Sequence, residues 1–171
     1  MPVVVAAAAV GFVLIAVAFV EVPSSSLPRR ITAAELQCTL SDVGPNFRVD
    51  YTQNLTPQPE DRWVQGNAIH FSNNTGPETQ VGCAVFTFNG RTDRDADFAR
   101  RRSYIMQSGS YVEPQPPSVG EASFYYEYGA GSSYGVEFLR GNFAVLIFVF
   151  SSAGFDFYPF TSHLAQRLAA K

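Results

Sequence analysis

The sequence predicts an α+β fold, in which a mainly antiparallel six-stranded sheet packs with about three helices and follows a hydrophobic N-terminal helix. Three observations predict this fold. Six apolar or alternating segments are typical of strands, short turn-forming segments join most of them, and helical patterns flank two groups of three strands. Because strands joined by short turns pair antiparallel and must bury an apolar face, we expect the helices to pack on the sheet as a sandwich.

The first twenty residues are expected to be a transmembrane anchor or a signal segment. Residues 3–20 carry no charge and would extend about 27 Å as a helix, close to the hydrocarbon thickness of a bilayer. They lack the preceding basic residues and the following small-residue site of a signal peptide. We therefore favour an uncleaved anchor, with a cleaved signal and a buried helix as alternatives. Residues 21–30, rich in Pro and Ser, are a predicted linker, and residues 31–171 a single domain.

Two features give opposite indications of the side of the membrane on which this domain lies. Arg29 and Arg30 follow the apolar segment, and the positive-inside rule would then place the domain in the cytoplasm. Cys38 and Cys83 are an even pair, and a bridge between them would close a loop of about 46 residues and stabilise the fold by about 4 kcal/mol. Two unrelated buried thiols are the alternative. We expect the bridge, and hence a cell-membrane protein with an extracytoplasmic domain or, alternatively, a secreted one.

The domain is predicted to begin with a helix and three strands. Thr32 and Glu35 form a capping box, which indicates a short amphipathic helix that carries Cys38 and ends before Gly44. Alternation or continuous apolarity then predicts strands over 47–52, 63–71 and 81–88. Because the third of these contains Cys83, a bridge from Cys38 would fasten the helix to the sheet.

A second helix is predicted from a cap at Thr92 to about Met106. Aspartates near its start and arginines further along suit the helix dipole, and Asp97 with Arg101 is a favourable i,i+4 pair. Arg102 falls within the apolar face formed by Phe98, Ala99, Ile105 and Met106. We expect its stem to cover apolar surface while its charge reaches water; the alternative is that it anchors an acidic partner.

The second group of strands is predicted to end in a hairpin. A strand over 121–128 comes first, and Gly141-Asn142 then suits a two-residue turn that needs a positive φ. The predicted register places Arg140 opposite Phe143, followed by the pairs Phe138/Val145, Val136/Ile147 and Tyr134/Val149. The strand over 143–150 is apolar on both faces, so we place it in the middle of the sheet. A last helix is expected after a cap at Asp156, with a buried stripe of Phe157, Phe160, Leu164 and Leu168.

The sequence contains no pattern typical of an active site or a metal site. His70 and His163 lack a ligand partner at helical spacing, the serines cluster in linkers and turns, and the glycine-rich run 129–135 opens no helix that could bind phosphate. We therefore expect no catalysis, no metal and no cofactor. A net charge of −3, with twelve basic and fifteen acidic residues, argues against nucleic acid.

Aromatic residues are the feature with the most functional promise. Tyr125 and Tyr128 face opposite sides of one predicted strand, so they cannot both be buried in a fold of two layers. Exposed tyrosines are common in recognition surfaces. The candidate partner surface is therefore Tyr125, Tyr126 and Tyr128 together with Arg102.

Four segments resemble small exported bacterial domains. They are GEASFYYEY (120–128), VEFLRGNFAVLIFVF (136–150), HLAQRLAAK (163–171) and LSDVGPNF (40–47). Those domains are similar in architecture to the Mog1/PsbP/LpqN group of α/β sandwiches. The chain departs from them in lacking a lipoprotein cysteine and in its aromatic strand. The resemblance implies an accessory or binding role outside the membrane and transfers no functional residue.

These observations together predict a non-enzymatic domain that is tethered to a membrane through residues 3–20. We expect it to bind a protein partner as an accessory subunit of a membrane or envelope complex. The alternative is a secreted carrier with an apolar cavity for a lipid or another small apolar ligand.

Overall fold

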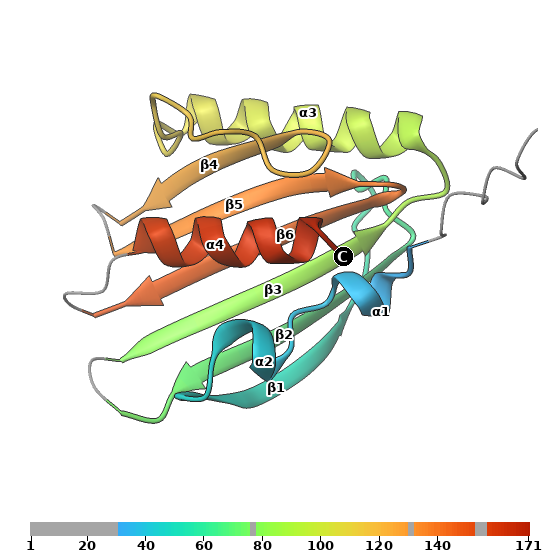
Figure 1. The fold of residues 1–171 in the computed structure, drawn as a ribbon. Helices are drawn as coiled ribbons and strands as arrows, with labels where there is room; N and C mark the ends of the chain where they lie inside the picture. Colours follow the sequence, from blue (N-terminus) through green and yellow to red (C-terminus); the bar gives the residue numbers. More distant parts are fainter. Residues whose placement is uncertain (1–30, 76–77, 130–131, 153–156) are drawn as a thin grey trace, which may run out of the picture. The chain divides into compact units, whose positions relative to one another are not determined.

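A computed structural model describes residues 31–75, 78–129, 132–152 and 157–171. Within them, six strands form one antiparallel sheet in the order β1-β2-β3-β6-β5-β4 (Figure 1). The strands are β1 (Phe47–Leu55), β2 (Gln65–Asn73), β3 (Thr79–Thr87), β4 (Ser123–Tyr128), β5 (Ser133–Arg140) and β6 (Phe143–Ser151). Two three-stranded meanders therefore meet where β3 pairs with β6. The predicted α+β fold is confirmed.

The helices cover both faces of the sheet. They are α1 (Ala33–Leu36), α2 (Leu40–Val43), α3 (Arg91–Gln107) and α4 (Phe157–Ala169). The first two helices and α4, drawn in blue and red, lie on the near side of the sheet in Figure 1, and α3 packs on the far side. Because helices pack on both faces, the fold has three layers, and residues on opposite sides of one strand can both be buried.

Two separate cores result from these layers. One lies under α1, α2 and α4 and includes Leu36, Phe71, Val136, Ile147 and Leu164. The other lies under α3 and is smaller; it includes Trp63, Phe86, Phe98, Ile105, Phe124 and Tyr126. Alternation along each strand sends one side chain to each core, as the pleat of a strand requires.

The β5–β6 hairpin has the predicted turn and register. Arg140 pairs with Phe143, and the pairs continue through Phe138↔Val145, Val136↔Ile147 and Tyr134↔Val149. Gly141 has a φ of 59°, a conformation that L side chains rarely adopt. The turn residues therefore set the register of the most apolar strand, β6, which lies in the middle of the sheet.

The first predicted helix is wrong in one respect, because it is two helices. Thr32 and Glu35 cap α1 as expected, but Gln37 is extended and ends it. The backbone N–H of Thr39 donates to the Asp42 carboxylate at 2.9 Å and begins α2. Cys38 thus lies in the link between the helices. A second local cap competes successfully with continuation of the first helix.

The predicted start of α3 is also wrong, and its predicted apolar face is wrong in part, because Phe98 and Ile105 are buried but Ala99 and Met106 are exposed. The helix is capped by Gly90 in place of Thr92. Its buried residues are Arg94, Asp97, Phe98 and Ile105, whereas Met106 is exposed. The predicted cap of α4, Asp156, lies outside the described residues. None of the described helices is long and apolar enough to cross a bilayer, and the predicted anchor, residues 3–20, also lies outside them.

Candidate binding surface on the open part of the sheet

One residue from every strand lies at the same level on the α3 side of the sheet. Cross-strand pairing connects them in the order Tyr51, His70, Gly82, Phe148, Gly135 and Tyr126. We call this set the aromatic row. Four of its members carry rings, and the two glycines lie between them in the sheet. The pleat places all six side-chain positions on one face.

The glycines let the rings of the row lie against the sheet. A Cβ at Gly82 would come within 2.1 Å of the Phe148 ring, and a Cβ at Gly135 within 2.3 Å of the Tyr126 ring. The ring of His70 stacks on Tyr51 with centroids 4.2 Å apart and meets the edge of Phe148 at 5.6 Å. The rings therefore rest on backbone and on one another, which restricts their rotamers.

Beyond the row, the next level of the sheet is more exposed. It consists of Ser72, Gln80, Phe150, Ser133 and Tyr128. Phe150 and Tyr128 are 38% and 44% exposed, and Tyr51 in the row is 52% exposed. We call Tyr51, His70, Phe148, Phe150 and Tyr128 the open face. It joins aromatic side chains from β1, β2, β4 and β6 on one surface.

A hollow of about 180 Å³ lies where α3 meets the β4 end of this surface. It is lined by Arg101, Tyr104, Ile105, Phe124, Tyr126, Tyr128, Glu137 and Leu146. We call it the tyrosine pocket. Tyr104 is 69% exposed, whereas Phe124, Tyr126 and Glu137 are buried. The pocket therefore runs from an exposed tyrosine on α3 to a buried carboxylate on β5.

Buried ion pairs form the floor of the pocket and attach α3 to the sheet. The Glu137 carboxylate accepts hydrogen bonds from Arg101 Nε at 3.0 Å and Nη2 at 2.6 Å. Arg101 Nη1 also donates to Asp97, which accepts from Arg100 Nη2 at 2.8 Å. Burial raises the pKa of Glu137 above its ordinary value, although the charge of Arg101 opposes the shift.

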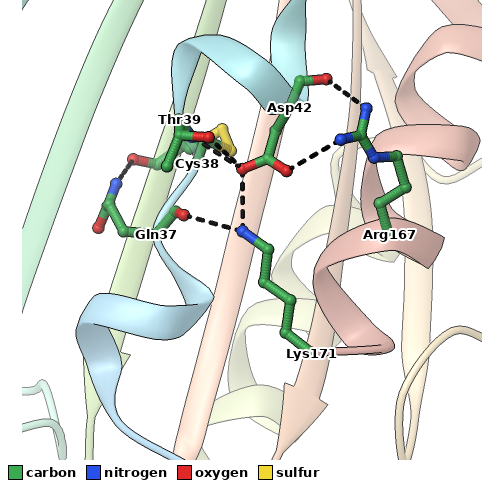
Figure 2. Close-up of a disulfide and its surroundings, with 7 residues drawn as sticks. Gln37, Cys38, Thr39, Asp42, Arg167 and Lys171 are labelled. Atoms are coloured by element: carbon green, nitrogen blue, oxygen red, sulfur yellow. Dashed lines mark hydrogen bonds and ion pairs between the residues drawn. A yellow bond between two sulfur atoms is a disulfide. The ribbon is translucent and has the colours of Figure 1, made fainter.

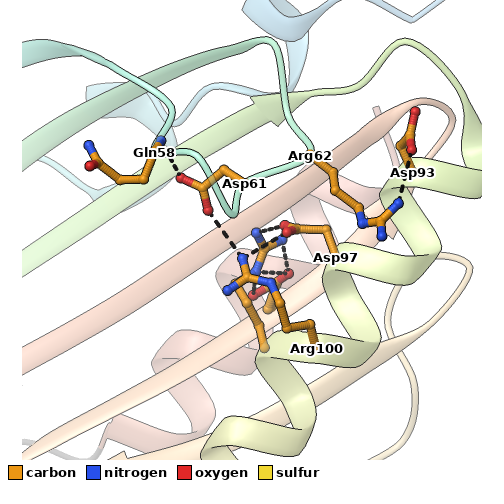
Figure 3. Close-up of polar contacts among 8 residues, drawn as sticks. Gln58, Asp61, Arg62, Asp93, Asp97 and Arg100 are labelled. Carbon is orange, nitrogen blue, oxygen red and sulfur yellow. Dashed lines mark hydrogen bonds and ion pairs between the residues drawn. The ribbon is translucent and has the colours of Figure 1, made fainter.

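The same ion pairs extend to the loop between β1 and β2 (Figure 3). Arg100 Nη2 donates to Asp61 at 3.1 Å, and Arg62 Nη1 lies 3.4 Å from Asp93 near the start of α3. Asp61 and Arg62 immediately precede Trp63 in the chain. The Trp63 ring packs on Phe86, with ring centroids 5.3 Å apart. The loop therefore contributes Trp63 to the core under α3.

The structure does not bring the predicted partner surface together. Tyr125 is 1% exposed and belongs to the core under α4, and Tyr126 is 6% exposed and lies under α3. Arg102 is exposed, but its Nη2 donates to the hydroxyl of Tyr111 at 2.9 Å. Of the three tyrosines, Tyr128 alone reaches the open face. The prediction failed for the other two because it assumed two layers and the fold has three.

Sequence reasoning missed the other members of the open face. Tyr51 and His70 belong to predicted strands, and Phe148 and Phe150 to the most apolar one. Alternation indicated which neighbours share a face, but not which part of that face α3 leaves uncovered. Glu137 gave a usable signal, because an acidic residue within an apolar strand needs a buried partner.

The opposite face of the sheet is fastened by the predicted disulfide. Cys38 and Cys83 are bonded, with their Cα atoms 6.0 Å apart, so the α1–α2 link is attached to β3 (Figure 2). Asp42 beside it accepts hydrogen bonds from Lys171 Nζ at 2.9 Å and from Thr39 Oγ1 at 2.8 Å. Burial alone would raise the pKa of Asp42, but these hydrogen bonds outweigh it and lower the pKa.

The other hollows and side-chain clusters of the described residues give less indication of a ligand. A hollow of about 640 Å³ beside α1 is lined by small and polar residues, among them Ala33, Gln37 and Asn67. None of the lining residues is aromatic or a long aliphatic residue, in contrast to the usual lining of a lipid cavity. In the described part of the chain, no group of three or more His, Cys, Asp and Glu residues could hold a metal ion.

Comparison of the chain with protein-family models, with curated proteins and with solved structures finds no match. The resemblance to the Mog1/PsbP/LpqN group therefore stays a prediction. The open face and the tyrosine pocket are the features of the described residues that bear on function.

Proposed function

We propose that residues 31–171 form a non-enzymatic binding domain that residues 3–20 hold at the outer side of a cell membrane. The domain binds a protein partner through the open face and acts as an accessory subunit of a membrane or envelope complex. The observation that carries this proposal is the aromatic row, which crosses every strand and whose rings Tyr51, His70 and Phe148 lie outside the core under α3.

The composition of the open face supports protein binding. Tyrosine and phenylalanine are enriched at the centres of protein interfaces, where a few of them supply most of the binding free energy. Here Tyr51, Phe150 and Tyr128 are exposed, and Ser72, Gln80 and Ser133 lie among them or beside them as polar groups. Aromatic groups surrounded by polar ones are the usual composition of such a surface.

The restricted positions of the rings also support this function. Binding costs free energy when side chains that move in the free protein must be fixed. Phe148 lies against Gly82, and His70 is held between Tyr51 and Phe148. The rings are thus placed before a partner arrives. The row spans six strands, or about 24 Å, which is wide enough for a protein patch.

The linker supports a site of action close to the bilayer. Ten residues, 21–30, separate the predicted anchor from the domain, and a chain of that length reaches about 35 Å when fully extended. A partner in the same membrane, or attached to it, would therefore lie within reach.

Site-specific photo-crosslinking in the native membrane tests the proposal. A photo-reactive phenylalanine analogue is placed in the full chain at Tyr51 or at Phe150. The matched control carries it at Leu40, which is exposed on α2, on the opposite face. We expect the same discrete protein adduct from both open-face positions and none from Leu40. Phe150→Asp should abolish the adduct formed at Tyr51, whereas Leu40→Asp should not.

Two results would contradict the proposal. One is the same adducts from Leu40 as from the open face, which would show that contact is not specific to the row. The other is the absence of any protein adduct from Tyr51 and Phe150 in chains that retain the disulfide. Unfolding midpoints of the Phe150→Asp and Leu40→Asp variants establish that both remain folded.

A further inference from the structure

The tyrosine pocket combines aromatic walls with a buried carboxylate. Tyr104, Tyr126 and Tyr128 contribute rings from α3 and β4, and the rings of Tyr126 and Tyr128 meet edge to face at 5.2 Å. Phe124, Ile105 and Leu146 complete the apolar lining. Faces of aromatic rings carry partial negative charge and attract cations within about 6 Å. The lining therefore suits a ligand group that has an apolar stem and a positive end.

The charges at the floor of the pocket are unequal. Three carboxylates, those of Asp61, Asp97 and Glu137, share two guanidinium groups, those of Arg100 and Arg101. Each nitrogen of Arg101 donates to Glu137 or Asp97. An anion that approached this guanidinium would therefore also meet one of these carboxylates. The cluster therefore has an excess of one negative charge and favours a cation.

The carboxylate of Glu137 retains capacity to accept a further hydrogen bond. A carboxylate offers about four lone-pair positions, and Arg101 occupies Oε1 twice and Oε2 once. Desolvation makes the negative charge of Glu137 costly, as its raised pKa indicates. A second cation close to that carboxylate would reduce this cost.

We propose that the tyrosine pocket receives a lysine side chain of the protein partner. This inference rests on the proposed function, because the pocket adjoins Tyr128 of the open face. The lysine stem packs between Tyr104 and Tyr128 at the exposed end, and its ammonium group reaches Tyr126 and Glu137 at the buried end. A primary ammonium is favoured over a quaternary one because it donates hydrogen bonds to the carboxylate. Partner binding thereby gains a charged anchor next to an aromatic surface.

An NMR titration of the full chain in detergent micelles, with ¹³C-labelled tyrosine rings, tests the inference without the partner. The probes are Nα-acetyl-lysine-N-methylamide, the isosteric norleucine derivative, the glutamate derivative and phosphocholine. We expect the lysine probe to shift the Tyr104 and Tyr128 signals and to bind about twofold to fivefold more tightly than the norleucine probe. Neither the glutamate derivative nor phosphocholine should bind more tightly than the lysine probe.

Two variants on one helix provide the matched comparison. Tyr104 and Met106 are both exposed residues of α3, but Met106 does not line the pocket. Tyr104→Ala should remove most of the preference for lysine over norleucine, Tyr104→Phe should retain it, and Met106→Ala should leave it unchanged. Neither side chain supports the buried core, so both variants are expected to fold.

Several results would overturn the inference. These are equal affinity for the lysine and norleucine probes, including no binding of either, and tighter binding of the glutamate derivative. Tighter binding of phosphocholine would also overturn it and would indicate a lipid headgroup. The crosslinking experiment is independent of these probes, so failure of the proposed function and failure of the lysine preference can be distinguished. Loss of the protein adduct would overturn the lysine of a protein partner even if the pocket preferred the lysine probe.

Discussion

The two faces of the sheet are covered to different extents, and this difference separates stability from recognition. Under α1, α2 and α4, one core extends from Phe71 on β2 to Tyr125 on β4 and includes the disulfide. Under α3, the core is smaller. It includes Phe86 on β3 and Phe124 on β4, and it ends at Tyr126. Beyond Tyr126, the same face carries the other rings of the aromatic row, Tyr51, His70 and Phe148. A sheet that is fully supported on one side can thus leave aromatic side chains exposed on the other.

The charged clusters that fasten the two layers also differ. Arg101 and Glu137 lie between α3 and the sheet, with side chains 20% and 3% exposed. On the other face, Asp42 is buried, but its partners Arg167 and Lys171 are 42% and 31% exposed at the end of α4. Removing a partner from the first cluster leaves a buried charge, whereas water can compensate part of the loss in the second.

The largest effect is expected from Arg101→Met. The variant leaves the carboxylate of Glu137 buried without its main partner, and breaking such a pair costs about 3 kcal/mol of the free energy of unfolding. We take the lower end of the usual range because Arg101 is partly exposed. Urea unfolding measures the loss. The double variant Arg101→Met with Glu137→Leu should recover most of it, because it removes both charges and keeps the volume.

That double variant also identifies what the ion pair does. If its stability stayed as low as that of Arg101→Met, the loss would come from packing of the arginine stem on Phe86, where the guanidinium carbon lies 5.2 Å from the ring centroid. The unpaired charge would then not be the cause. The prediction distinguishes these two contributions to the attachment of α3.

A smaller and pH-dependent effect is expected from Asp42→Asn on the other face. Because hydrogen bonds lower the pKa of Asp42 below 3.8 in the folded protein, its stabilisation is complete above that pH. It is lost as the pH falls through the folded pKa. At pH 7 the variant should lose about 2 kcal/mol, the usual contribution of hydrogen bonds to a charged group.

The measurement is urea unfolding of both proteins between pH 7 and pH 3. The difference between them should shrink below pH 3.8. Asp50→Asn is the control, because the ion pair of Asp50 with Arg48 is exposed on the edge strand β1. A difference for Asp42→Asn that did not change with pH would mean that shape, and not charge, makes Asp42 important.

The sequence allowed the covered face to be predicted better than the open one. Gly141 and the pair Cys38 and Cys83 are local or chemically specific signals, and both predictions are confirmed. The aromatic row depends on the pairing of β3 with β6, which joins Gly82 to Phe148. It also depends on where α3 stops along the sheet. Alternation within a strand predicts neither which distant strands pair nor which part of the sheet a helix covers.

The smallest effect on stability, and the most direct test of the row, is expected from Gly82→Ala. The new Cβ would overlap the ring of Phe148, so this ring must move off the sheet and leave its contact with His70. We expect a loss of about 1 kcal/mol in urea unfolding, at the low end for overpacking because Phe148 is only half-buried and can swing outward. In a Phe148→Ala background the same substitution should cost almost nothing, and this coupling is measured by the double-mutant cycle. An equal loss in both backgrounds would mean that the glycine serves the backbone of β3. A loss that vanishes would mean that Gly82 is needed to seat the Phe148 ring of the aromatic row.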